Sequence, residues 1–250
     1  MEDRTPKTNN LNKILISLMA HIEPKMLQKD YQNRINTKNV DKNKLKEYRQ
    51  LFQSIKFFYE RVMKYEVYFA EFYPETNNIS KTEALNYHIH SYLEDIDILR
   101  NKIKNFLGHL KKDLKKIATN KGEIDKAFKH IIAQVENVFN NVSKYRRLHH
   151  HNGMQFLDGT LVYSEGLHMI LQKENPLRKL LKVEAAKKLQ KKEKDSFTKA
   201  KNHWIAQSRK NNIQITGFID EVLKKNEKFI YQLLNIRPIK DIIGENETQK

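Results

Sequence analysis

The sequence predicts an all-α protein, a bundle of long antiparallel helices with additional helices at both ends. Apolar residues recur at alternating spacings of three and four over long stretches, as they do on the buried face of a helix. Only 7 glycines and 5 prolines occur among 250 residues, so few positions interrupt those stretches. Hydrophobic residues make up 39% of the chain and aromatic residues 10%, which supplies a buried core.

The first helix is expected where apolar residues recur from Leu11 to Ile22, and Pro24 is expected to bend or end it. The polar stretch from Asp30 to Asn43 indicates a loop. A second helix is predicted from Lys44 to Tyr73, just before Pro74. Its apolar stripe consists of Leu45, Tyr48, Phe52, Ile55, Tyr59, Val62, Tyr65, Phe69 and Phe72.

The most regular pattern predicts a helix from Lys81 to Thr119, with Ser80 and Glu83 as a capping box at its start. Its buried row contains Ile89, Tyr92, Ile96, Leu99, Ile103, Phe106 and Leu110. After a turn at 120–122, a second row contains Ile124, Phe128, Ile131, Val135, Val138, Val142, Tyr145 and His149. That helix should end at Asn152 and Gly153, since glycine is favoured beyond a helix C-cap. Two long helices joined by a short turn should pack antiparallel.

The segment from Met154 to Tyr163 departs from helical spacing. Asp158-Gly159 lies between two apolar runs, a pattern typical of a β-hairpin, so a small hairpin is expected there. A loop that leads into a short helix from Leu161 to Leu171 is the alternative.

Pro176 is suited to the first turn of the next helix. The stretch from Lys182 to Lys201 is rich in lysine, and its ordinary interpretation is a solvated helix face. An apolar stripe resumes before Pro238 with Ile215, Ile219, Val222, Phe229 and Leu233. We therefore expect a single helical domain over residues 1–243, with a core at about 44–153, C-terminal helices at about 176–236 and a frayed tail at 244–250.

Composition limits the function further. The chain has no cysteine, which excludes disulfides, zinc fingers and thiolate catalysis. It shows neither a signal peptide nor an 18-residue apolar span, so we expect a cytoplasmic protein with no membrane partner. The net charge of +17 favours polyanions such as nucleic acid. The lysine-rich stretch offers candidate nucleic-acid contacts at Lys187, Lys188, Lys191 and Lys192.

The signatures of phosphate-binding loops, dinucleotide binding, zinc proteolysis and serine hydrolysis are absent from the sequence. One cluster stands out, at the end of the helix predicted after Gly122. It contains the only Arg-Arg pair of the chain and three of its ten histidines, in the run Tyr145-Arg146-Arg147-Leu148-His149-His150-His151-Asn152. Arg146 and His150 are four positions apart and share a helix face, and His151 follows where the helix should end.

Arginine and histidine together suit phosphodiester chemistry. Arginine donates a planar fork to phosphate oxygens, and histidine moves protons near neutral pH. RNA supplies its own nucleophile, the 2′-hydroxyl, so no metal or other cofactor is required. The alternatives are ordinary cations that stabilise a helix C-terminus, and a metal site of consecutive histidines. We expect no metal, since neighbouring helix positions point in different directions.

This cluster resembles the motif of the HEPN superfamily, helical-bundle proteins of prokaryotic toxin and abortive-infection systems, over at most Lys81 to Leu171. Their motif is R-x4-6-H near the end of a bundle helix, matched here by Arg146 and His151 with His150 beside them. The usual polar residue after the arginine is replaced by Arg147. Asn152 would support the site, and an acidic residue on an earlier helix would contact the arginine.

Glu94 and Asp95 are the candidates for that acidic residue. The resemblance implies metal-independent RNA cleavage through a 2′,3′-cyclic phosphate, a homodimer whose two motifs face each other, and an antitoxin-like protein partner. The second hypothesis is a non-catalytic basic helical protein that binds nucleic acid or a protein partner.

Overall fold

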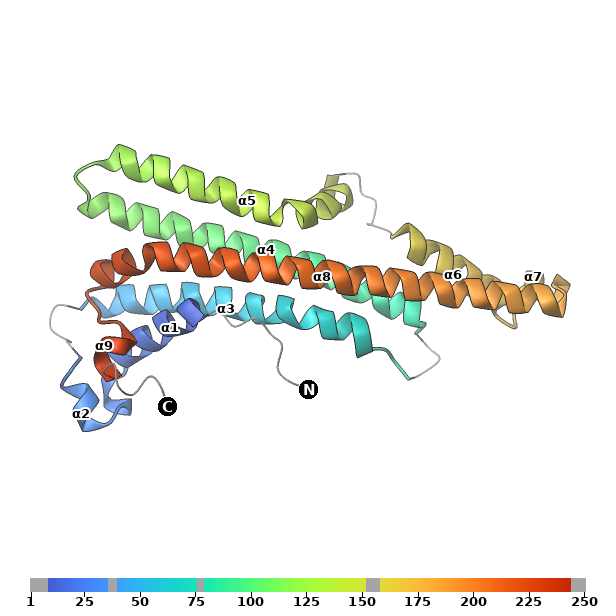
Figure 1. Cartoon of the computed structure of the whole chain (residues 1–250), viewed down its shortest axis with the longest axis horizontal. Coiled ribbons are helices and arrows are strands. Elements are labelled where there is room, and N and C mark those ends of the chain that lie inside the picture. The colour runs from blue at the N-terminus through green and yellow to red at the C-terminus, as the bar shows by residue number, and fades with distance from the viewer. Residues whose placement is uncertain (1–8, 36–39, 76–78, 152–157, 244–250) are drawn as a thin grey trace. The chain divides into compact units, whose positions relative to one another are not determined.

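The computed structural model describes residues 9–35, 40–75, 79–151 and 158–243, and at positions 9, 141, 143–151 and 243 it describes the helical backbone alone. Within these residues the fold is all-α and contains no strand, which confirms the predicted fold class (Figure 1). The elements are α1 (Asn9–Ile22), a 3-10 turn η1 (Pro24–Met26), α2 (Lys29–Gln32), α3 (Lys42–Glu71), α4 (Lys81–Ile117), α5 (Lys121–His151), α6 (Gly159–Leu171), α7 (Pro176–Leu180), α8 (Val183–Leu234) and α9 (Ile239–Ile243).

The chain divides into two compact units. Unit 1 comprises Met1–Glu60, Ile98–Asn140 and Ile213–Lys250, and unit 2 comprises Arg61–Asp97 and Asn141–Asn212. The helices α3, α4, α5 and α8 each begin in one unit and end in the other.

The core of unit 1 is aromatic and aliphatic. Phe106 of α4 packs against Phe52 of α3 with ring centroids 4.8 Å apart, and Tyr48 meets the same ring edge-on at 6.5 Å. At the rim of this core the Tyr48 hydroxyl donates to Asp113 Oδ2 at 3.2 Å. Burial and the neighbouring carboxylate raise the pKa of Tyr48, so the phenol stays protonated and remains a donor.

Ion pairs in unit 1 establish the direction of α4 relative to α5. Lys104 Nζ lies 2.6 Å from Glu136 Oε1, and Lys115 Nζ lies 2.9 Å from Asp125 Oδ2. Because the later residue of α4 meets the earlier residue of α5, the two helices run antiparallel here, as the sequence predicts. All seven residues of the predicted α4 row are buried.

The core of unit 2 is an aromatic cluster. Tyr92 of α4 lies 5.3 Å from Tyr65 and 5.5 Å from Phe69 between ring centroids, and Trp204 of α8 lies 6.4 Å from the Tyr92 ring. The buried Tyr92 hydroxyl accepts a hydrogen bond from Asn211 Nδ2 at 3.0 Å. This contact satisfies the buried polar ends of both side chains.

The helix ends follow local hydrogen bonding. Ser80 and Glu83 form the predicted capping box: the Glu83 N–H donates to Ser80 Oγ at 3.0 Å, and the Ser80 N–H donates to Glu83 Oε2 at 3.3 Å. At the start of α5 the Glu123 N–H donates to Asn120 Oδ1 at 3.3 Å, and the Asn120 side-chain Nδ2 donates to Glu123 Oε1 at 2.8 Å. The turn therefore occupies 118–120, and the helix already contains Gly122. At the end of α8, Asn235 has φ of 52° and closes the last turn.

The expected hairpin around Asp158-Gly159 is wrong. Asp158 is the N-cap of α6, and its Oδ1 accepts from the Thr160 and Leu161 N–H groups at 2.9 and 3.2 Å. An aspartate before a helix satisfies otherwise unpaired N–H groups, and here that bonding replaces the turn of a hairpin. The alternative, a loop that leads into a short helix, is confirmed for residues 158–171.

Two other expectations need correction. The segment from Asp30 to Asn43 is not entirely a loop, because Asp30 belongs to the short helix α2 and Lys42 to α3. Pro176 does begin a helix, with the Asn175 side chain capping the Leu177 N–H at 2.9 Å. That helix ends after five residues, and the lysine-rich stretch belongs to α8, which has 52 residues.

Candidate functional site

The Arg-His cluster falls on the end of α5. The described backbone is helical through His151, so positions 146 and 150 lie one turn apart on one helix. The side chains of Arg146, Arg147, His150 and His151 lie outside the described residues, as does all of Asn152. The catalytic assignment of this cluster stays a prediction.

The two acidic residues assigned to support the cluster differ in their surroundings. Glu94 is exposed on α4. Asp95 is buried, and its Oδ2 accepts from the Tyr65 hydroxyl at 2.7 Å and pairs with Arg61 at 2.9 Å. Burial, together with this hydrogen bond, raises the pKa of Tyr65, which keeps the donor proton on the phenol. Among the described residues, Asp95 therefore joins α3 to α4 inside unit 2.

The four lysines selected from the sequence are all exposed on α8. Lys187 and Lys191 are four positions apart, and Lys194 follows three positions later, so these three share one face of the helix. We call them the lysine stripe. The stripe extends for about 10 Å along the helix axis, from the rise of about 1.5 Å per residue. Lys188 and Lys192 lie beside it.

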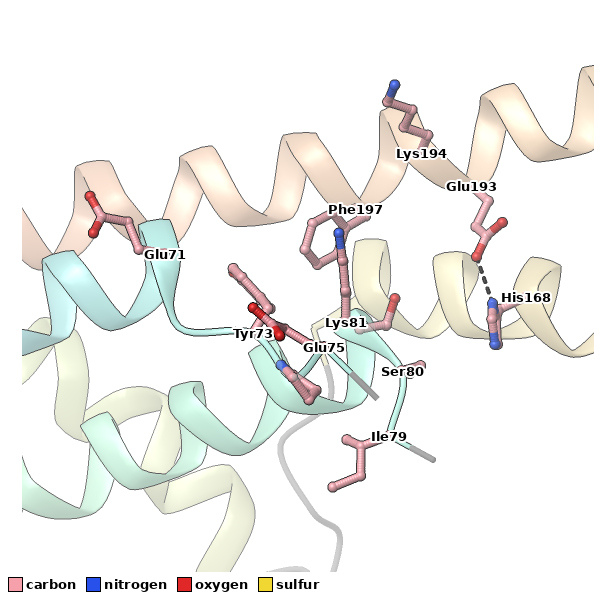
Figure 2. Close-up of a pocket in the computed structure, with 12 residues that line it drawn as sticks. Glu71, Tyr73, Glu75, Ile79, Ser80, Lys81, His168, Glu193, Lys194 and Phe197 are labelled. Atoms are coloured by element: carbon pink, nitrogen blue, oxygen red, sulfur yellow. Dashed lines mark hydrogen bonds and ion pairs between the residues drawn. The ribbon is translucent and has the colours of Figure 1, made fainter. Parts of the chain in front are cut away.

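The lysine stripe ends at a cavity of about 690 Å³ within unit 2, because Lys194 belongs to the cavity lining (Figure 2). Four parts of the chain form the lining: the end of α3 with the segment after it, the start of α4 with the segment before it, α6 and α8. The lining residues are Glu71, Tyr73, Pro74, Glu75, Ile79, Ser80, Lys81, Thr82, His168, Glu193, Lys194 and Phe197.

One wall of the cavity carries an imidazole–carboxylate pair. His168 Nδ1 of α6 lies 2.8 Å from Glu193 Oε1 of α8, shown by the dashed line in Figure 2. The backbone at Glu193 is also held, since Ser164 Oγ donates to its carbonyl oxygen at 3.2 Å. A carboxylate on Nδ1 fixes the orientation of the imidazole ring and leaves Nε2 as the nitrogen available to a ligand.

A second wall is aromatic. The rings of Tyr73 and Phe197 meet edge-to-face with centroids 5.5 Å apart, and each ring is half-buried. The Tyr73 hydroxyl donates to the Phe69 carbonyl oxygen at 2.6 Å, which holds the ring in place. Burial raises the pKa of Tyr73 to about 12, so this donor stays protonated.

The cavity lining is mixed in charge. It contains Glu71, Glu75 and Glu193 beside Lys81 and Lys194, and the Lys194 side chain points away from Tyr73 and Phe197 (Figure 2). Sequence reasoning missed this site because its residues come from segments separated by about a hundred positions and form no compact motif. The one signal in the sequence was the lysine-rich run, of which Lys194 is a part.

Within the described residues, no group of three or more histidine, aspartate or glutamate side chains is placed to hold a metal ion. No helix in the described part of the chain is both long and apolar enough to cross a lipid bilayer. Comparisons of the chain with protein-family models, with curated proteins and with solved structures find no match.

Proposed function

We propose that the protein binds single-stranded RNA through the lysine stripe of α8. One observation carries this proposal. Lys187, Lys191 and Lys194 are exposed on one helix face, and Lys194 borders a cavity with aromatic side chains. A row of cations follows a phosphate backbone, and aromatic rings take unstacked bases. The net charge of +17 adds a long-range attraction to any polyanion.

The charge around the stripe also favours this function. Between Val183 and Lys201 the helix carries lysines at positions 187, 188, 191, 192, 194, 199 and 201, against acidic residues at 184, 193 and 195 only. None of the four lysines predicted from the sequence forms an ion pair with another described residue. They are therefore available to neutralise phosphates and release counterions.

The test measures the affinity of a fluorescein-labelled twelve-nucleotide RNA by anisotropy between 50 and 300 mM NaCl. The double variant Lys187→Ala/Lys191→Ala should bind more weakly at low salt and reduce the slope of log K against log salt by about 1.4, from about 0.7 per phosphate contact on a single strand. The control is Lys224→Ala/Lys228→Ala, an exposed pair with the same spacing on the same helix. If both double variants lose the same affinity, binding depends on the total charge of the protein and not on the lysine stripe.

A second function, metal-independent RNA cleavage by the cluster at the end of α5, rests on the helical backbone there. Because residues 121–151 form one helix, Arg146 and His150 occupy positions one turn apart, and His151 follows directly. In the proposed reaction histidine removes the proton from a 2′-hydroxyl, and that oxygen attacks the adjacent phosphorus. The bond from phosphorus to the 5′-oxygen breaks, histidine returns a proton to that oxygen to give a 5′-hydroxyl, and a 2′,3′-cyclic phosphate remains. Arginine would stabilise the charge that develops on the phosphate oxygens.

The assay for cleavage uses end-labelled RNA and DNA of one sequence in EDTA. RNA should be cut and DNA left intact, because DNA lacks the 2′-hydroxyl. Arg146→Ala and His151→Ala should each abolish cutting while circular dichroism shows an intact fold. Sedimentation of the wild type at several concentrations tests the homodimer. RNA that is bound but never cut would favour the non-catalytic alternative.

A further inference from the structure

We infer that the cavity at the end of the lysine stripe binds one unpaired guanine of the RNA strand. This inference rests on the proposed RNA binding and adds a base preference to it. Three parts of the lining carry the argument: the aromatic wall, the carboxylates, and the last lysine of the stripe.

The aromatic wall accounts for a base rather than a phosphate. Tyr73 and Phe197 present half-buried rings that are held by each other and by the bond from Tyr73 to Phe69. A flat base that has lost its stacking neighbour in the strand regains one against such a ring. Stacking alone does not select a base, because every base has a flat aromatic face.

The carboxylates argue for a ligand with N–H donors. Carboxylate oxygens only accept hydrogen bonds and repel phosphate, so the phosphate stays on the stripe while the base enters the cavity. Glu193 is already paired with His168. Glu75 is exposed two positions after Tyr73, and it has no ion pair among the described residues, which makes it the carboxylate available to the base.

Guanine is the base that matches a carboxylate. Its N1–H and N2–H donors lie side by side and meet both carboxylate oxygens at once. Uracil offers a single N–H on that edge, and adenine places an acceptor nitrogen beside its amino group. A bidentate contact of this kind discriminates between bases by about tenfold or more.

The strand reaches the cavity along the stripe. Lys194 belongs both to the stripe and to the cavity lining, so a backbone that follows Lys187 and Lys191 arrives beside the cavity. The Lys194 side chain points away from Tyr73 and Phe197 (Figure 2), so it meets a phosphate outside the cavity. The phosphates and the base are thus bound by different groups, and each contribution can be removed separately.

The experiment compares three fluorescein-labelled heptamers, UUUGUUU, UUUAUUU and UUUUUUU, by anisotropy at one salt concentration. The wild type should bind UUUGUUU about tenfold more tightly than the other two. Glu75→Gln should remove this preference, so that the three heptamers bind with equal affinity, because the amide turns an N–H toward the donors of guanine. Glu184→Gln, a change of an exposed residue on α8 outside the cavity, should leave the preference intact.

The outcomes separate this inference from the proposed function. Salt-dependent binding of all three heptamers with equal affinity overturns the guanine site and leaves RNA binding in place. A preference for guanine that persists in Glu75→Gln overturns the assignment of that carboxylate as the guanine contact. Failure to bind any heptamer at low salt overturns the proposed function itself, and titration with free GMP and AMP then decides whether the cavity takes guanine without a strand.

Discussion

The indole N–H of Trp204 donates to Asp158 Oδ2 at 2.9 Å, while the other oxygen of that carboxylate caps the first turn of α6. Trp204 is 1% exposed, so water does not reach its N–H in place of this acceptor. The Asp158 side chain therefore caps the start of α6 and also accepts the hydrogen bond of the largest buried side chain of α8.

Replacing Asp158 should consequently cost stability twice. Asp158→Ala removes an N-cap, which costs about 1 kcal/mol of folding free energy. It also leaves the buried indole N–H without this acceptor, which costs about 1–3 kcal/mol more. We expect a total loss of about 2–4 kcal/mol in urea unfolding followed by the fluorescence of Trp204, the only tryptophan of the chain. Asp195→Ala, at an exposed position on α8, is the control. A loss below about 0.5 kcal/mol in Asp158→Ala would show that the contact contributes little.

Stability should also fall on acidification because of His21. This residue is buried on α1; its Nδ1 lies 2.8 Å from the Ser17 carbonyl oxygen, and its Nε2 accepts from the Arg237 N–H at 3.1 Å. Both nitrogens are used by the neutral ring. Burial lowers the pKa of His21, and the nearby Arg237 adds to this effect, although the bond to Ser17 opposes it.

The lowered pKa of His21 makes the folded protein less stable in acid. As pH falls below about 6.5, the unfolded chain binds a proton at this histidine before the folded protein does, so the free energy of unfolding decreases. Urea titrations at pH 7.5, 6.5 and 5.5 should show this decrease in the wild type and in His203→Gln, where the changed histidine is exposed. In His21→Gln the decrease should shrink, and an unchanged pH dependence would exclude His21 as its source.

Two neighbouring positions test the register of α8. Ile230 is fully buried, whereas Phe229 is 51% exposed. Ile230→Asp should lower the free energy of unfolding by about 4 kcal/mol or more, because a carboxylate enters the core without a partner. Phe229→Asp should cost less than about 1 kcal/mol. Thermal melts followed by circular dichroism compare the two, and equal costs would contradict this register.

The two acidic neighbours on α4 should likewise differ. Asp95→Asn removes the charge that pairs with Arg61 and weakens the acceptor of the Tyr65 hydroxyl. We expect a loss of about 1–3 kcal/mol, reduced from the cost of a fully buried pair because Arg61 is half exposed. Glu94→Gln, at an exposed position, should be neutral within about 0.5 kcal/mol. If Glu94→Gln abolishes RNA cleavage in a folded protein, Glu94 is the supporting residue of the cluster.

The fold was largely predictable because long helices leave a regular signal. The α4 row and the Ser80–Glu83 capping box depend only on spacing within one helix, and both are confirmed. Phe72 was predicted to be buried and is 64% exposed, because α3 ends at Glu71 before it. In α8 the buried position 226 holds an asparagine, whose Nδ2 donates to the Val222 carbonyl oxygen at 2.8 Å. Because asparagine is polar, the apolar pattern does not include position 226, and it predicts Phe229 to be buried in place of Ile230.

The candidate site was much less predictable. The pairing of His168 with Glu193 and of Tyr73 with Phe197 depends on how separate helices pack, and no spacing along the chain records it. Asp158 shows the same limit on a smaller scale. Its role as a helix cap and indole acceptor is decided by α6 and α8 together, whereas the dipeptide Asp-Gly alone indicates a turn.

Unit 1 combines early and late parts of the chain, which affects how the protein folds during synthesis. Ser17 Oγ of α1 accepts a hydrogen bond at 2.8 Å from the Ile239 N–H, 222 positions later in the chain. Ala20, Ile35 and Ile242 form a small buried cluster, and Ile239 packs against it. Since translation proceeds from the N-terminus, α1 leaves the ribosome long before α9 is synthesised. During that time the apolar face of α1 lacks its contacts with α9. A nascent chain truncated before Ile213 should therefore engage chaperones, and unit 1 should complete its folding only after release.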